Sequence, residues 1–248
     1  MEKSLFFVKK RVEAFRGLWV PATRDGDTGI GHTFEKVVLG KEEDNIGIAD
    51  MNGLEIKTKD VDSNAMLTLF TKAPTHFPNA NTFIRETFGE ATEFGTKTLY
   101  VTVSSSKTVD KNGNSWWLNV KDFGEKLSLC VMGPERPPVL PPDNIYWSYD
   151  FLRWIIREKI KDMCLVEADR REVNGQVYFR YHRVTLLLNA SVWRFLTCVE
   201  AGDIVFEIRM GVHKSGSMAG KPHDHGGGFR IAKRNFHKLY EHVQVLEV

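Results

Sequence analysis

The hydrophobic residues near the start of the chain recur with the period of an α-helix. This spacing predicts helices over residues 3–18 and 28–39. Thr28 is a residue type favoured at helix N-caps, and Gly40 is a type that commonly ends helices. The chain is therefore expected to open with two helices, the second of which has both a start and a stop signal.

After Gly40 the pattern changes to the alternation of β-strands. Residues 46–50 and 54–58 alternate around Asn52-Gly53, which is a strong hairpin signal, and a second strand pair turns at Asn174-Gly175. Further strands are predicted at 66–72, 97–104, 116–120, 127–131, 184–188 and 203–212, helices at 81–88, 148–163, 189–200 and 236–243, and a loop at 213–228.

This order of elements predicts an α/β or α+β fold with a mixed sheet. Residues 133–142 hold five of the nine prolines, so this segment is expected to be an extended connection. We therefore divide the chain into a lobe of residues 1–140 and a lobe of residues 141–248.

The composition is that of a globular protein, with 42% hydrophobic and 27% charged residues among 248. No apolar run approaches the roughly 18 residues of a membrane span, and the N-terminal segment has no small-residue cleavage site. Three widely spaced cysteines in apolar runs argue against a zinc site and a disulfide framework. These features favour a cytoplasmic protein with reduced thiols and no membrane partner.

The net charge of +2 conceals a local excess of basic residues. Seven Lys and Arg residues lie between Ile208 and Lys238, with Asp224 as the only acid in that window. Such an excess favours a surface that binds polyanions. The alternative is a solvated surface whose counter-charges lie elsewhere in the fold, and charge alone does not decide between the two.

Asp50, Glu55 and Lys57 are the first candidates for chemistry. Side chains alternate along a strand, so Glu55 and Lys57 share one face while Leu54 and Ile56 face the core. The turn brings Asp50 back beside them. Two carboxylates and the main-chain carbonyl of Ile56 make an oxygen site suited to Mg²⁺, with Lys57 placed to orient a water or balance charge. The alternative is a hairpin with ordinary surface charges, because such triplets often arise by chance.

The basic window also holds residue types that contact DNA bases. Arg bonds guanine bidentately and Glu accepts from cytosine, so Glu207 and Arg209 on one strand face are a candidate pair, with a salt bridge between them as the alternative. His76, in a loop of the first lobe, is a candidate for the opposite groove or an ordinary turn histidine. The remaining candidates are His223, His225 and Arg230 for bases, and Lys233, Arg234 and Lys238 for phosphates.

Three segments carry a resemblance to a known family. Gly29-Ile30-Gly31-His32-Thr33-Phe34-Glu35, then Ala49-Asp50-Met51-Asn52-Gly53-Leu54-Glu55-Ile56-Lys57-Thr58, and the tail Gly228-Phe229-Arg230-Ile231-Ala232-Lys233-Arg234-Asn235-Phe236 resemble the MutH/Sau3AI branch of the PD-(D/E)XK nucleases. Within that branch the chain is similar to the MvaI group of restriction endonucleases. The resemblance implies a mixed sheet flanked by helices, in two lobes around a DNA cleft.

The same resemblance implies roles for residues. Asp50 and Glu55 match the metal-binding acids, Lys57 matches the lysine that closes the motif, and Glu35 matches an additional carboxylate directed into the site. Lys97 is compatible with a further lysine on the active-site side or with a plain surface lysine. Departures from MutH itself, at Thr28 and Gly227, put in doubt any transfer of MutH's own target sequence or partners.

The function implied is a Mg²⁺-dependent type II restriction endonuclease of the bacterial cytoplasm. Its partner would be double-stranded DNA with a short, G·C-flanked, nearly palindromic site, cut to leave 5′-phosphates, and a cognate DNA methyltransferase would be a functional rather than a physical partner. A central base pair defeats two-fold symmetry, so a monomer is expected. The alternatives are a MutH-like enzyme that nicks one strand and a catalytically inactive DNA-binding protein.

Overall fold

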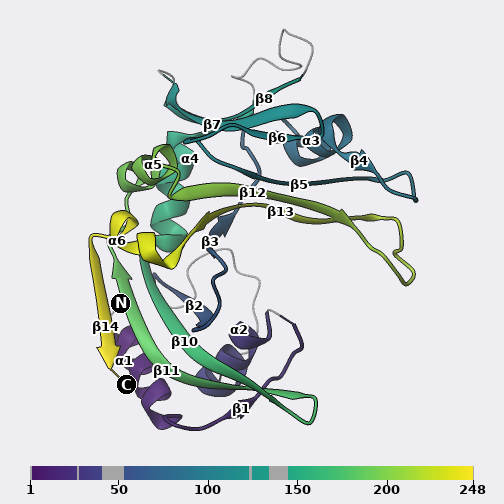
Figure 1. Cartoon of the computed structure of the whole chain (residues 1–248). Helices are drawn as coiled ribbons and strands as arrows, with labels where there is room; N and C mark the ends of the chain where they lie inside the picture. Colours follow the sequence, from purple (N-terminus) through teal and green to yellow (C-terminus); the bar gives the residue numbers. More distant parts are fainter. Residues whose placement is uncertain (1, 27, 41–52, 123–124, 134–144, 248) are drawn as a thin grey trace. The chain divides into compact units, whose positions relative to one another are not determined.

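The computed structural model describes residues 2–26, 28–40, 53–122, 125–133 and 145–247. It is a mixed α+β protein with several sheets, as the order of elements predicted (Figure 1). The chain forms two compact units: unit 1 contains residues 1–65, 155–191 and 236–248, and unit 2 contains residues 66–154 and 192–235.

These boundaries differ from the division at residue 140 that the prolines suggested, because both units are built from separated segments. In unit 1 the early strand β2 (Leu54–Asp60) pairs in parallel with β10 (Asp162–Val173). In unit 2 the early strand β3 (Leu67–Thr71) pairs with β13 (Pro222–Ile231). Parallel pairing needs a long connection, and here that connection is most of unit 2.

Unit 1 contains a sheet with the helices α1 and η1 packed on one of its faces. The strand order is β1-β11-β10-β2, and β14 also pairs with β11. The bounds of its other elements are α1 (Glu2–Ala14), β1 (Val20–Pro21), α2 (Gly29–Thr33), η1 (Phe34–Leu39), η2 (Ile156–Ile160), β11 (Gln176–Leu188), α6 (Phe236–Leu239) and β14 (His242–Glu247).

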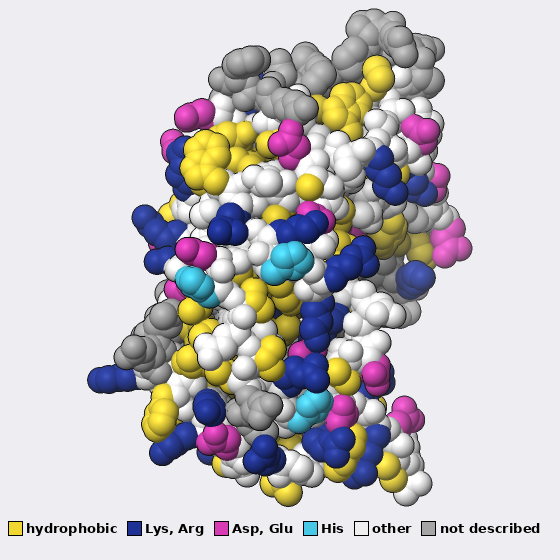
Figure 2. All heavy atoms as spheres, turned by 60° about the vertical axis from the view of Figure 1, so that its left-hand side comes forward, with side chains coloured by type: hydrophobic (Ala, Val, Ile, Leu, Met, Phe, Trp, Pro, Cys, Tyr) yellow, Lys and Arg dark blue, Asp and Glu magenta, His cyan; other side chains and the backbone are white. Residues whose placement is uncertain are grey.

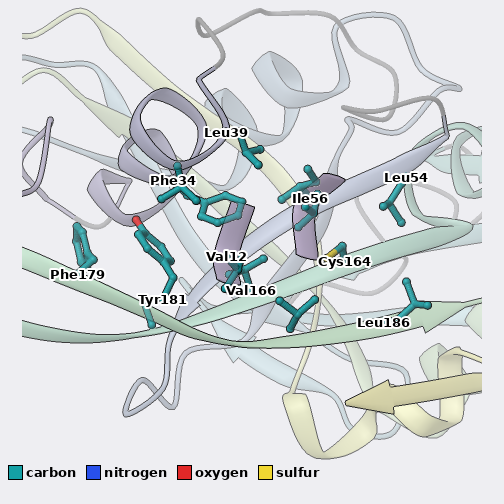
Figure 3. Close-up of a cluster of buried hydrophobic side chains, with 14 residues drawn as sticks. Val12, Phe34, Leu39, Leu54, Ile56, Cys164, Val166, Phe179, Tyr181 and Leu186 are labelled. Carbon is teal, nitrogen blue, oxygen red and sulfur yellow. The ribbon is translucent and has the colours of Figure 1, made fainter. Parts of the chain in front are cut away.

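The hydrophobic core of unit 1 lies between this sheet and the helices α1 and η1 (Figure 3). Val12 and Phe34 come from the helices, and Ile56, Cys164 and Val166 come from the strands. Because side chains alternate along a strand, the residues between these core positions point to the opposite face of the sheet. We call that opposite face the site face, and it carries Glu55 and Lys57.

Unit 2 contains two sheets. One has the order β3-β13-β12-β5-β4 and the other β6-β7-β8-β9. The bounds of the remaining elements are α3 (Ala80–Phe88), β4 (Glu90–Ala91), β5 (Lys97–Val103), β6 (Val109–Lys111), β7 (Asn114–Asp122), β8 (Lys126–Met132), β9 (Tyr146–Ser148), α4 (Tyr149–Ile155), α5 (Val192–Glu200), β12 (Ile204–Val212) and η3 (Lys233–Asn235). An aromatic core holds them together, in which Phe229 contacts both Trp147 and Phe206.

The structure differs from the sequence prediction in two places near the C-terminal end. The predicted loop over 213–228 is shorter, because β13 begins at Pro222 and pairs with both β12 and β3. The predicted helix over 236–243 ends at Leu239, and β14 follows it along the edge of β11. The alternation of apolar and polar residues in His242–Glu247 fits this strand better than a helix.

Three further expectations concern cysteines, membranes and charge. All three cysteines are buried and outside disulfides, and burial raises the pKa of the Cys164 thiol to about 12. Within the described part of the chain, none of the helices is long and apolar enough to cross a bilayer. On the face drawn in Figure 2, Lys and Arg side chains are interspersed with acidic and hydrophobic ones.

Candidate active site

Glu55 and Lys57 lie side by side on the site face of β2. Lys57 Nζ is 2.5 Å from Glu55 Oε1, which confirms the prediction that they share a face. Glu55 is 1% exposed, and the side chain of Lys57 is 30% exposed. Burying a carboxylate is costly unless a cation compensates it, so this ion pair stabilises Glu55 in its charged form.

A second cation, Lys159, approaches the same carboxylate. Its Nζ is 3.9 Å from Glu55 Oε2. Lys159 lies on the π-helical turn η2, which follows α4, and π-helical turns are rare and often occur at functional sites. Lys159 was not among the predicted site residues, because residues 148–163 were interpreted as one amphipathic helix. The alternation of Arg157, Lys159 and Lys161 at its end was the available signal.

Tyr240 is a second residue near the carboxylate that the sequence did not reveal. Its side chain is buried, and its hydroxyl donates to Met163 Sδ at 3.9 Å. Burial raises the pKa of Tyr240, and the negative charges of Glu55 and Asp162 raise it further. Tyr240 therefore stays neutral at physiological pH and can act near Glu55 only as a hydrogen-bonding group.

The other predicted residues of this site stand as follows. Asp50 lies outside the described residues, and so does the first arm of the predicted hairpin. Ile56, which lies between Glu55 and Lys57 in the sequence, is buried in the core, as the alternation predicted. Glu35 is half-buried on the π-helical turn η1, next to Phe34, which packs in the same core as Ile56. Among described residues, no group of three His, Cys, Asp or Glu side chains could hold a metal ion.

Three of the predicted base-contact residues form a charged cluster in unit 2. Glu207 Oε2 is 2.8 Å from Arg230 Nε and 3.3 Å from Arg209 Nε. Burial lowers the pKa of Arg230, with Arg209 acting in the same direction and Glu207 opposing it. The salt bridge considered as an alternative for Glu207 and Arg209 is therefore present, and it also includes Arg230. These three side chains lie on the face of β12 and β13 opposite the buried Phe206 and Phe229.

The glycines that precede Arg230 are part of strand β13, and one of them is required by packing. A Cβ on Gly227 would lie 2.1 Å from Phe206 Cζ, whereas a Cβ on Gly228 would meet atoms only at 3.4 Å or beyond. Phe206 is 1% exposed. Gly227 thus allows an aromatic ring to support the backbone beneath the Glu207 cluster.

Two predicted histidines are held by ring stacking. The imidazole of His223 stacks on that of His213, with centroids 4.2 Å apart and planes 4° from parallel. His76 forms a β-bridge to Tyr146 and stacks on its ring at 3.9 Å. Its Nδ1 lies 3.3 Å from the hydroxyl of Thr75. Neither histidine is therefore a freely rotating surface residue.

The remaining candidates are basic or lie outside the described side chains. Lys233 and Arg234 are exposed on the turn η3, and Lys238 is exposed on α6. The side chain of His225 is not described. Lys97 belongs to unit 2, where its ammonium donates to the carbonyl of Glu86 at 2.5 Å.

Comparison with known proteins shows the family to which the chain belongs. A model of the MvaI/BcnI restriction endonuclease family matches residues 10–240. The solved complex of restriction endonuclease MvaI with its cognate DNA substrate is 32% identical, covers 99% of both chains and has a TM-score of 0.90. MvaI without DNA is 32% identical over 99% of this chain and 98% of its own, with a TM-score of 0.61. A search of curated sequences found no match. The chain therefore belongs to the MvaI/BcnI restriction endonuclease family and is a type II site-specific deoxyribonuclease.

Proposed function

We propose that this protein is a Mg²⁺-dependent restriction endonuclease that cuts double-stranded DNA at a short, G·C-flanked, nearly palindromic site and leaves 5′-phosphates. The observation that carries the proposal is the buried Glu55 carboxylate between two lysine ammonium groups, Lys57 and Lys159. A buried carboxylate with two neighbouring ammonium groups is suited to a site that binds the negative charge of a phosphate. The MvaI complex with DNA supports DNA as the partner.

The donor set fits a hard divalent cation. Carboxylate oxygens of Asp50 and Glu55 and the carbonyl of Ile56 would hold it, because Mg²⁺ prefers oxygen ligands and few of them from protein. When bound, the ion supplies Lewis acidity toward the phosphate and a lower pKa for a coordinated water. Glu35, on η1, is the candidate for an additional carboxylate.

Two lysines of this chain, Lys57 and Lys159, have roles in the proposed cleavage step. Lys57 is partly exposed and already fixed by Glu55, so its ammonium can donate to the attacking water or to a phosphate oxygen. Water attacks phosphorus while the bond from phosphorus to the 3′ oxygen breaks, which leaves a 3′-hydroxyl and a 5′-phosphate. Lys159 balances the negative charge of the Glu55 carboxylate and orients it during this step.

Base recognition is assigned to unit 2. The Glu207 cluster presents one acceptor and two guanidinium groups, the pair of functions that recognises a G·C base pair. Arg209 and Arg230 would bond guanine, and Glu207 would accept from cytosine. His223, His225 and His76 are the further base contacts of the proposal, and Lys233 and Arg234 contact phosphates.

We also propose a monomer with one catalytic centre, protected in the cell by a cognate DNA methyltransferase. A site with one central base pair lacks perfect two-fold symmetry, so a single subunit must cut the two strands in turn. Supercoiled plasmid should therefore pass through nicked circles before it becomes linear. A stable dimer in light scattering at sub-micromolar concentration, without DNA, would contradict this part of the proposal.

Plasmid and phage DNA digested with Mg²⁺, and in parallel with excess chelator, test the function directly. The proposal expects discrete double-strand fragments with Mg²⁺ alone, and end labelling should show 5′-phosphates. Persistent nicks without fragments would favour the MutH-like alternative, and a mobility shift without cleavage would favour a DNA-binding protein. Glu55→Gln should abolish cleavage while retaining binding, and Glu158→Gln, a change on the same turn as Lys159, should cleave normally.

A further inference from the structure

The far end of the β10–β11 hairpin carries an aromatic and basic cluster that the proposed function does not use. The guanidinium of Arg171 lies 4.1 Å from the ring centroid of Trp19, and that of Arg180 lies 5.0 Å from the same ring. Arg171 is also 5.7 Å from the ring of Tyr178. We call Trp19, Arg171, Tyr178 and Arg180 the Trp19 cluster.

An acidic residue fixes one of these arginines. Asp169 Oδ2 accepts from Arg180 Nε at 2.8 Å and from Nη2 at 2.5 Å, and Oδ1 lies 3.1 Å from His182 Nε2. Burial would raise the pKa of Asp169, but the hydrogen bond from Arg180 and the nearby charges lower it below its ordinary value. The Asp169 carboxylate thus stays ionised and holds Arg180, whereas Arg171 is exposed and stacked.

The sheet register places the cluster on the site face, together with Glu55 and Lys57. Lys57 pairs with Leu165, and Leu165 and Arg171 have the same parity along β10. The bulge opposite Glu167 leaves His182 as the extra residue of β11, so β10 keeps its alternation. From Leu165 to Arg171 the strand extends about 20 Å at ~3.3 Å per residue. One face of one sheet therefore carries both the candidate active site and the cluster.

We propose that the Trp19 cluster is a docking surface for the DNA backbone on the flank of the cleavage site. A guanidinium stacked on an indole keeps its in-plane N–H groups directed outward, in the fork that binds phosphate oxygens. A reach of about 20 Å corresponds to about six phosphates of one strand at 3.4 Å each. The contact is to phosphate, so it strengthens binding to any duplex. This inference rests on the proposed function.

The competing explanation is that the cluster only fastens Trp19 and β1 to the hairpin. Arg170 provides the matched control, because it is exposed on the same strand and points to the opposite face. Binding of the full-length chain to a fluorescent duplex of random sequence should be measured without divalent metal over a series of salt concentrations. Thermal unfolding of each variant should be measured in parallel.

Arg171→Gln should reduce the slope of log K against log salt by about one unit, and at ~0.15 M salt the affinity should fall about fivefold. Arg170→Gln should leave both values unchanged. Arg171→Lys keeps the charge, so it should retain the slope while losing part of the affinity.

Equal slopes for Arg171→Gln and Arg170→Gln would overturn the inference, above all if only Arg171→Gln lowered the unfolding temperature. Such a result would leave the proposed function standing as long as the parent chain bound the duplex. A parent chain that bound no DNA would overturn both proposals together.

Discussion

Gly227→Ala tests whether the glycine run before Arg230 is a packed strand or a flexible loop. The new Cβ would lie 2.1 Å from Phe206 Cζ and 2.8 Å from both Cε atoms. The Phe206 ring has no easy retreat, because it packs on Trp147 and Phe229 with centroids 4.7 and 4.9 Å away. Overpacking of this kind costs about 1–3 kcal/mol.

For a chain of this length, 1 kcal/mol corresponds to about 2–4 °C in the unfolding temperature. We therefore expect Gly227→Ala to unfold about 2–12 °C below the parent in scanning calorimetry. Gly228→Ala is the matched control, because its Cβ would make only ordinary contacts, and its unfolding temperature should not fall. Phe206→Leu, which replaces the ring by a smaller side chain, should then lower the free energy of unfolding less in the Gly227→Ala background than in the parent. In a double-mutant cycle this difference should be about 1–2 kcal/mol.

The reasoning fails if Gly227→Ala and Gly228→Ala unfold at the same temperature. That result would mean that the strand moves away from Phe206 at no cost, as a flexible loop would. Additive effects in the double-mutant cycle would likewise show that the destabilisation does not come from this contact.

Three further predictions follow from charged groups. Lys159→Met should lower the free energy of unfolding by about 1–3 kcal/mol and slow plasmid cleavage about tenfold, because Glu55 loses one of its two neighbouring cations. The control Lys161→Met changes an exposed lysine and should have neither effect. Arg230→Ala should cost about 1–3 kcal/mol at the cognate site and little on random DNA; equal losses in a binding titration would make Arg230 a phosphate contact. The pKa of Asp169 is lowered in the folded state, so its contribution is present above about pH 3.9 and lost as pH falls through the lower folded pKa. The difference in unfolding free energy between Asp169→Asn and the parent should accordingly shrink below that pH.

Local patterns predicted much of the fold and part of the site. Alternation along β2 placed Glu55 and Lys57 on one face, and their ion pair confirms it. The Asn174-Gly175 turn was predicted because a two-residue hairpin turn requires positive φ at both positions, which Asn and Gly tolerate. Both residues adopt positive φ. The resemblance to the MvaI group is confirmed by the family match. The ion pair and the turn share one property, since each depends on neighbours in the sequence.

The misses depend on partners far along the chain. Lys159 contacts Glu55 from a distant part of the chain, and the helical pattern of residues 148–163 gave no hint of the π-helical turn. Gly227 was assigned to the predicted loop over 213–228 because the ring that requires it, Phe206, belongs to another strand. The Pro-rich segment suggested a boundary by composition, whereas pairing between β2 and β10 decides where the units divide.

The parallel pairing of β2 with β10 has a consequence for how the protein folds. The strand that carries Glu55 and Lys57 finds this partner only about a hundred residues later in synthesis, so the contact has a high sequence separation and forms slowly. Closing so long a loop costs conformational entropy, which grows only with the logarithm of the loop length. Prior folding of unit 2 should bring the two ends of this loop together and so accelerate the pairing of β2 with β10. Lys159, at 3.9 Å from the carboxylate, arrives with the same late segment. A nascent chain thus cannot assemble this charged centre until residues 159–173, about two thirds of the way along the chain, have left the ribosome.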